Sequence, residues 1–114
     1  MVFVIENITS KSLEESINWM NNGITSIENK MNENKEYEAQ KEFYELEEKW
    51  NGNIDTLALF VEHNELEKIS NDVVIIESNF ETNEKEKVME NIAELKFMLS
   101  HIGEKNILKL KNIF

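Results

Sequence analysis

The feature that most constrains this chain is an apolar side chain that returns every three or four residues with almost no interruption. Its first stretch consists of Leu13, Ile17, Met20, Ile24, Ile27 and Met31. That spacing places these side chains on one face of an α-helix. Proline is absent and glycine occurs only three times, so few residues oppose a helix once it has begun. The pattern predicts long amphipathic helices.

The same spacing predicts the limits of the first two helices. Thr9 and Ser10 offer hydroxyl caps, so we expect a first helix over about 10–33. The polar segment 32–35 holds two asparagines, which favour a turn. A second helix is expected from Glu36 to Val61, with Gly52 marking a kink or a close helix crossing.

The second half of the chain predicts two further helices and a short tail helix. The third begins after Asn64, and Val74 and Ile75 widen its apolar face, so it should be largely buried. Thr82–Asn83 is expected to cap a fourth helix, and Gly103 to end it. We therefore expect an all-α fold: one domain over residues 1–114, an antiparallel helical bundle of about four helices plus a short C-terminal helix.

Composition argues against several classes of partner and chemistry. The formal net charge is −11 and arginine is absent, so the surface should repel nucleic acid and anionic lipid headgroups. The absence of cysteine excludes disulfides and thiolate catalysis. The sequence contains no Gly-rich phosphate loop, nucleophile elbow or metalloprotease helix motif. We expect no enzyme activity and no cofactor.

The only two histidines raise the question of a metal site. We expect His63 and His101 at helix ends, with Glu65 and Glu104 close by in sequence. The ends of the second and fourth helices lie on the same side of an up-down bundle, so these four side chains could converge on one cation. Neither histidine follows the metalloprotease-type spacing that pairs two histidine ligands on one helical face, and a zinc site normally needs three or four ligands. They are weak candidates, and we expect no metal; the alternative is that each histidine stabilises a helix C-terminus.

Exposed apolar residues are the candidates for partner contact. Trp19 and Phe97 lie off the best apolar stripes of their helices. The C-terminal segment, with Ile113 and Phe114 at its end, combines lysines with large apolar side chains, so it is not composed like a frayed terminus. We expect it to complete the core as a short helix; the alternative is that it binds a partner.

Several segments together resemble one protein family. They are Trp50, the run 60–69 closing on His-Asn-Glu-Leu, the run 93–102 closing on His-Ile, and the ending Leu110–Phe114. The sequence resembles the domain of unknown function 4363 family, whose members are small proteins of low-GC Gram-positive bacteria. The resemblance implies an extracytoplasmic helical domain behind an N-terminal membrane anchor, with no established activity. It also implies that His63 and His101 matter.

This chain departs from the family in lacking such an anchor: no stretch approaches the roughly 20 apolar residues that span a bilayer. We therefore expect Met1–Ile5 to be what remains of a removed anchor. The leading hypothesis is a membrane-tethered interaction domain that holds a protein partner, such as a membrane or cell-envelope protein. The alternatives are a cation or small-ligand sensor using the His63 and His101 end, and a structural homodimer.

Overall fold

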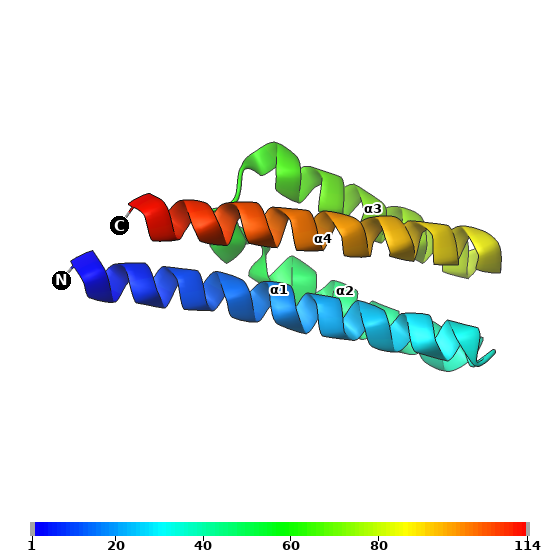
Figure 1. Cartoon of the computed structure of the whole chain (residues 1–114). Helices are drawn as coiled ribbons and strands as arrows, with labels where there is room; N and C mark the ends of the chain where they lie inside the picture. The colour runs from blue at the N-terminus through cyan, green and yellow to red at the C-terminus, as the bar shows by residue number, and fades with distance from the viewer. Residues whose placement is uncertain (1, 114) are drawn as a thin grey trace.

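The computed structural model describes the backbone of residues 2–113 and the side chains of residues 11–106. Its regular elements are four helices, α1 (Val2–Asn32), α2 (Glu36–Leu57), α3 (His63–Glu81) and α4 (Lys85–Ile113). They run alternately up and down, and α1 and α4 lie side by side along their length (Figure 1). The bundle is elongated, with extents of 50 × 23 × 21 Å. The predicted all-α antiparallel bundle is confirmed.

The core forms along the apolar faces that the sequence predicts. Among the described side chains of α1, from residue 11 onward, the buried ones are the six of its repeat: Leu13, Ile17, Met20, Ile24, Ile27 and Met31. Phe43 and Trp50 of α2 are also buried, and the Phe43 ring lies 5.5 Å from that of Phe80 in α3. Burying these faces removes apolar surface from water, which is the main source of stability for helices of this kind.

Two turns of the same design close one end of the bundle. Asn34 and Asn83 both adopt positive φ angles, of 62° and 57°. The next residue after each asparagine donates its backbone N–H to a carbonyl five residues earlier, from Lys35 to Lys30 at 2.8 Å and from Glu84 to Asn79 at 2.9 Å. This is the Schellman arrangement, in which asparagine tolerates the left-handed conformation.

The prediction that Thr82–Asn83 caps the fourth helix is therefore wrong. Thr82 is the C-cap of α3, and its Oγ1 donates to the Ser78 carbonyl at 3.1 Å. The left-handed Asn83 then ends α3, and α4 begins at Lys85. The predicted turn at 32–35 is confirmed.

The glycines act differently from the prediction. Gly103 does not end the fourth helix, because α4 continues to Ile113 as one helix and no separate C-terminal helix forms in the described backbone. A Cβ at Gly103 would lie 3.0 Å from Ile17 Cγ2, so Gly103 allows α4 to approach α1. The predicted close crossing at Gly52 is wrong, because a Cβ there would meet nothing within 4 Å.

Three other predictions differ from the structure. The first helix begins at Val2, so Thr9 and Ser10 lie within α1. The second ends at Leu57 rather than Val61, because the chain turns through 58–61 to reach α3 while Val61 still enters the core. Val74 and Ile75 are exposed, since the buried face of α3 does not extend to them.

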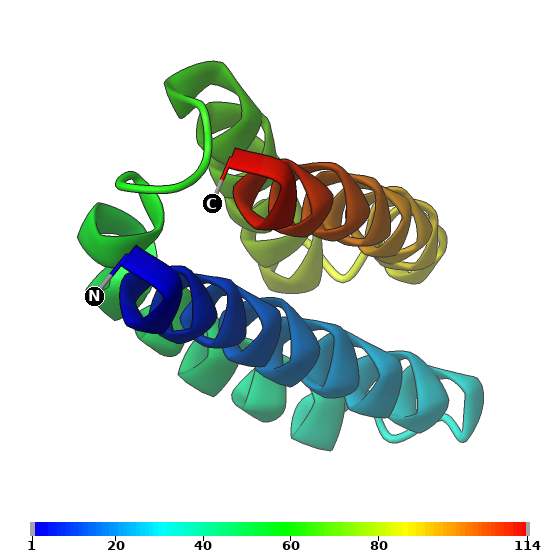
Figure 2. The ribbon, with the colours of Figure 1, turned by 60° about the vertical axis from the view of Figure 1, so that its left-hand side comes forward.

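The closest packing in the bundle is between α1 and α4, while α2 packs on α1 and α3 packs on α4 (Figure 2). The α2 and α3 helices contact each other far less. We call the end with the asparagine turns the turn end, and the end with the connection 58–62 the connection end. Within the described residues, no helix is long and apolar enough to cross a membrane.

Candidate functional site

The connection end carries a hollow between the start of α3 and the middle of α4. Its volume is about 310 Å³. The hollow is lined from α3 by Asn64, Glu65 and Lys68, and from α4 by Phe97, His101 and Lys105. The antiparallel packing of α3 on α4 brings these residues together from segments that lie about 30 to 40 positions apart. We call it the connection-end hollow.

One wall of the connection-end hollow is fixed by Glu65. Its carboxylate accepts hydrogen bonds from Lys105 Nζ at 2.7 Å and from Asn106 Nδ2 at 3.0 Å. Asn106 is buried and also donates to the Ile102 carbonyl at 2.9 Å, so its amide is held in place. Partial burial raises the pKa of Glu65, but the bonds from Lys105 and Asn106 outweigh it, and the pKa lies below its usual value.

The opposite wall is an exposed aromatic pair on α4. The Phe97 side chain is 74% exposed. Its ring stacks on the imidazole of His101, with centroids 6.4 Å apart and planes 4° apart. Phe97 and His101 are one helical turn apart, so the helix itself sets this geometry. The two parallel rings together present an exposed aromatic surface at the edge of the hollow.

The four weak metal candidates are not gathered at one point. His63 is the first residue of α3 and pairs loosely with Glu67, at 3.8 Å from Nε2 to Oε2. It lines a different hollow, beside Leu66 and Ser70, whereas His101 and Glu65 line the connection-end hollow. Glu104 is exposed. Among the residues with described side chains, no group of three or more His, Cys, Asp or Glu is placed to hold a metal ion.

The two histidines are also placed differently from the prediction. We expected both at helix ends, near a C-terminus. His63 instead begins α3, and His101 lies well inside α4 because that helix continues past Gly103. His101 therefore does not lie at the C-terminus of its helix, whereas His63 shares a hollow with Ile54, Asp55 and Ala58 at the end of α2.

The four partner-contact candidates have separate positions. Phe97 is exposed at the connection-end hollow, as described above. Trp19 is half-buried and packs against the core, with Lys49 Nζ 4.5 Å from the centre of its ring. Ile113 and Phe114 lie outside the residues whose side chains the structure describes.

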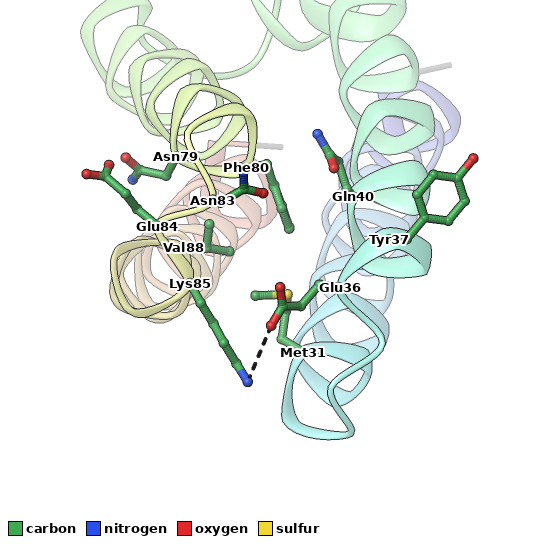
Figure 3. A pocket seen from close by; sticks show the side chains of 10 residues that line it. All are labelled: Met31, Glu36, Tyr37, Gln40, Asn79, Phe80, Asn83, Glu84, Lys85 and Val88. Carbon is green, nitrogen blue, oxygen red and sulfur yellow. Dashed lines mark ion pairs between the residues drawn. The ribbon is translucent and has the colours of Figure 1, made fainter.

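The turn end has a smaller hollow of about 240 Å³ (Figure 3). Met31, Phe80 and Val88 form an apolar floor, and all three are buried. Lys85 Nζ lies 2.6 Å from Asn34 Oδ1 and 3.6 Å from Glu36 Oε1, so it connects the two turns. We call it the turn-end hollow.

Sequence reasoning missed two carboxyl groups that the fold places in unusual surroundings. Asp72 of α3 is only 6% exposed, and its Oδ2 has no hydrogen-bond partner. Burial, with a smaller contribution from Glu94, raises the pKa of Asp72 to about 6. Burial also raises the pKa of Glu47, with Glu77 and Glu81 adding to the effect, to about 7. No local pattern distinguishes these acids from the other 21, since their surroundings depend on the neighbouring helix.

Comparison with known proteins identifies a family. The model of the family described as Domain of unknown function (DUF4363) matches residues 7–113. No curated protein and no solved structure matches the chain.

Proposed function

The chain belongs to the domain of unknown function 4363 family, and from that premise we propose that it is a protein–protein interaction domain without catalytic activity. The proposed contact surface is the connection-end hollow with the Phe97–His101 pair at its edge. One observation carries this proposal: Phe97 is 74% exposed, with its ring parallel to the His101 imidazole at the edge of a hollow.

The chemistry of this surface supports a protein partner. Aromatic residues are enriched at the centres of protein interfaces, where they bury large area at a small cost in conformational entropy. Glu65, Lys105 and Asn106 supply a polar rim whose hydrogen bonds are already made.

A membrane tether and an extracytoplasmic location are further parts of the proposal. They rest on the family resemblance, because known members carry an N-terminal anchor. Protease treatment of intact cells that produce the full-length protein tests the location. Degradation in intact cells supports it, whereas protection until the cells are lysed contradicts it.

Site-specific photo-crosslinking tests the contact surface. A photoreactive phenylalanine analogue replaces Phe97 in the full-length protein, expressed in its own cells. The control places the same analogue at Glu86, which is exposed on α4 near the turn end and lines neither hollow. We expect a discrete crosslinked protein from position 97 that position 86 does not give.

A substitution at Phe97 completes the test. Phe97→Ala removes an exposed ring, so the fold should remain intact by circular dichroism while capture of the crosslinked protein falls at least about tenfold. Identical products from positions 86 and 97, or no product at either, would overturn the proposed surface.

A further inference from the structure

The line along which α2 faces α3 is chemically distinct from the rest of the surface. Its members on α2 are Gln40, Tyr44 and Glu47, and its members on α3 are Ser70, Val74, Glu77 and Glu81, each set at helical spacing. Three contacts join α2 to α3 along this line. Phe43 packs on Phe80, Glu47 meets Glu77, and the Trp50 indole N–H donates to Ser70 Oγ at 3.0 Å. We call this line the α2–α3 seam.

The α2–α3 seam is the least closed interface of the bundle. The α2 and α3 helices contact each other far less than the other neighbouring pairs do, and the turn-end hollow opens at one end of the seam. Val74 is 61% exposed and Tyr44 38% exposed along it. The hollow, of about 240 Å³, is smaller than the roughly 300–1,000 Å³ pockets that take drug-sized ligands. Its size suits a single apolar side chain.

The charge along the α2–α3 seam is negative and unbalanced. Glu47, Glu77 and Glu81 gather where the two helices meet; burial raises the pKa of Glu47 most, and Glu77 and Glu81 raise it further. The ion pairs formed by lysines in the described part of the chain all involve other carboxylates, such as Glu42, Glu65 and Glu84. The protein's own cations therefore leave this cluster uncompensated, although a cation there would relieve the repulsion.

We infer that the α2–α3 seam is a second docking surface, and that its occupant is a basic amphipathic helix of a protein partner. The apolar face of that helix would cover Tyr44 and Val74 and place one side chain in the turn-end hollow. Its lysine or arginine residues would pair with Glu47, Glu77 and Glu81. From Ser70 to Glu81 the seam is about 16 Å long at 1.5 Å per residue, which accommodates roughly three helical turns. Binding of this kind is the helix-in-groove mode.

The inference goes beyond the proposed function because it uses other residues and names the chemistry of the partner. Its test is independent of Phe97, so either idea can fail alone. The probe is a synthetic helical peptide of about 14 residues, with leucine on one face and lysine on both flanks. A second peptide, with glutamate in place of lysine, is the control.

The two tryptophans of the chain allow the peptide to be located by NMR. The Trp50 indole N–H bridges the α2–α3 seam, whereas Trp19 lies on α1 beside Lys49. We expect the lysine peptide to shift the Trp50 indole resonance and leave that of Trp19 nearly unchanged. The glutamate peptide should shift neither.

Matched charge variants separate specific docking from general attraction to an acidic protein. The double variant Glu47→Gln with Glu77→Gln should weaken peptide binding about tenfold or more, the effect of losing one or two close charge pairs. Glu48→Gln with Glu86→Gln changes the net charge equally on exposed faces of α2 and α4 and should weaken it less than about twofold.

Several results would overturn the inference. Equal weakening by the two double variants would show that only net charge attracts the peptide. Absence of any shift at Trp50 would show that the peptide does not dock on the seam. A concentration-dependent dimer that the Glu47 and Glu77 variant alters would identify a second copy of the chain as the occupant instead.

Discussion

The two ends of this bundle are held together by different kinds of interaction. At the turn end, backbone hydrogen bonds close each asparagine turn within six consecutive residues. At the connection end, Glu65 binds Lys105 and Asn106, which lie about 40 positions away. The turn end is therefore specified by short sequence, whereas the connection end depends on α3 and α4 being packed first. A surface of the second kind is more sensitive to changes elsewhere in the fold.

The largest effect should come from enlarging Gly103, which lies on α4 near the connection end. Gly103→Leu would press on Ile17 of α1, so we expect a loss of about 2–3 kcal/mol in the free energy of unfolding. Gly52→Leu meets open space and should gain up to about 1 kcal/mol from helix propensity. Urea denaturation followed by circular dichroism measures both. Similar losses at the two positions would show that the α1–α4 approach is not the cause.

Substitutions of the side chains that close each end test directly whether side-chain contacts matter more at the connection end. Glu65→Ala leaves the buried Asn106 amide without one acceptor and Lys105 without its ion pair, so we expect a loss of about 2 kcal/mol. Lys85→Ala removes an exposed contact at the turn end and should cost under about 0.5 kcal/mol. Urea denaturation measures the loss of unfolding free energy in both variants. If Lys85→Ala proved the more costly, the assignment of side-chain closure to the connection end would be wrong.

The middle of α3 should give the bundle an unusual response to pH. The pKa of Asp72 rises from about 3.8 to about 6 on folding, so the folded state binds more protons between these values. The resulting stabilisation is complete below the unfolded pKa and is lost as the pH rises through about 6. Asp72→Asn should therefore raise stability at pH 7 by about 1–2 kcal/mol and flatten the profile.

Glu47 serves as the control for assigning the pH dependence near pH 6 to Asp72. Its pKa rises to about 7, so its contribution is lost at a higher pH than that of Asp72. Unfolding free energies measured from pH 4 to 8 in Asp72→Asn and Glu47→Gln separate the two. A wild-type profile that rises steadily with pH over this range would contradict both raised values.

The smallest effect should come from the asparagine turns. Asn83→Ala forces a Cβ-bearing residue without a helpful polar side chain into the left-handed region, so we expect a loss of about 1 kcal/mol. Asn83→Gly should be neutral or stabilising by a few tenths of a kcal/mol. Asn34 should behave in the same way because it closes an equivalent turn. Thermal melts of the alanine and glycine variants at both positions test whether the two turns contribute equally. A large difference between positions 34 and 83 would show that they do not.

Only part of the candidate site could be predicted from the sequence. Phe97 could be identified because it falls outside the apolar stripe of its helix, and the structure places it in the open. Trp19 also falls outside its stripe, yet it is half-buried and packs against the core. The roles of Glu65 and Glu47 could not be predicted from the sequence, since each depends on which residues of a neighbouring helix lie opposite.

The sequence by itself determined the helical class, the antiparallel bundle and the buried stripe of α1, because a repeat of three and four residues fixes which face of a helix is apolar. The tertiary structure decided the rest. It placed Gly103 at a helix crossing rather than a helix end, left Val74 and Ile75 in solvent, and brought Glu47 against Glu77. The physical reason is that periodicity sets the direction of a side chain within its own helix, whereas burial, crossing distance and charge depend on the helix that packs against it.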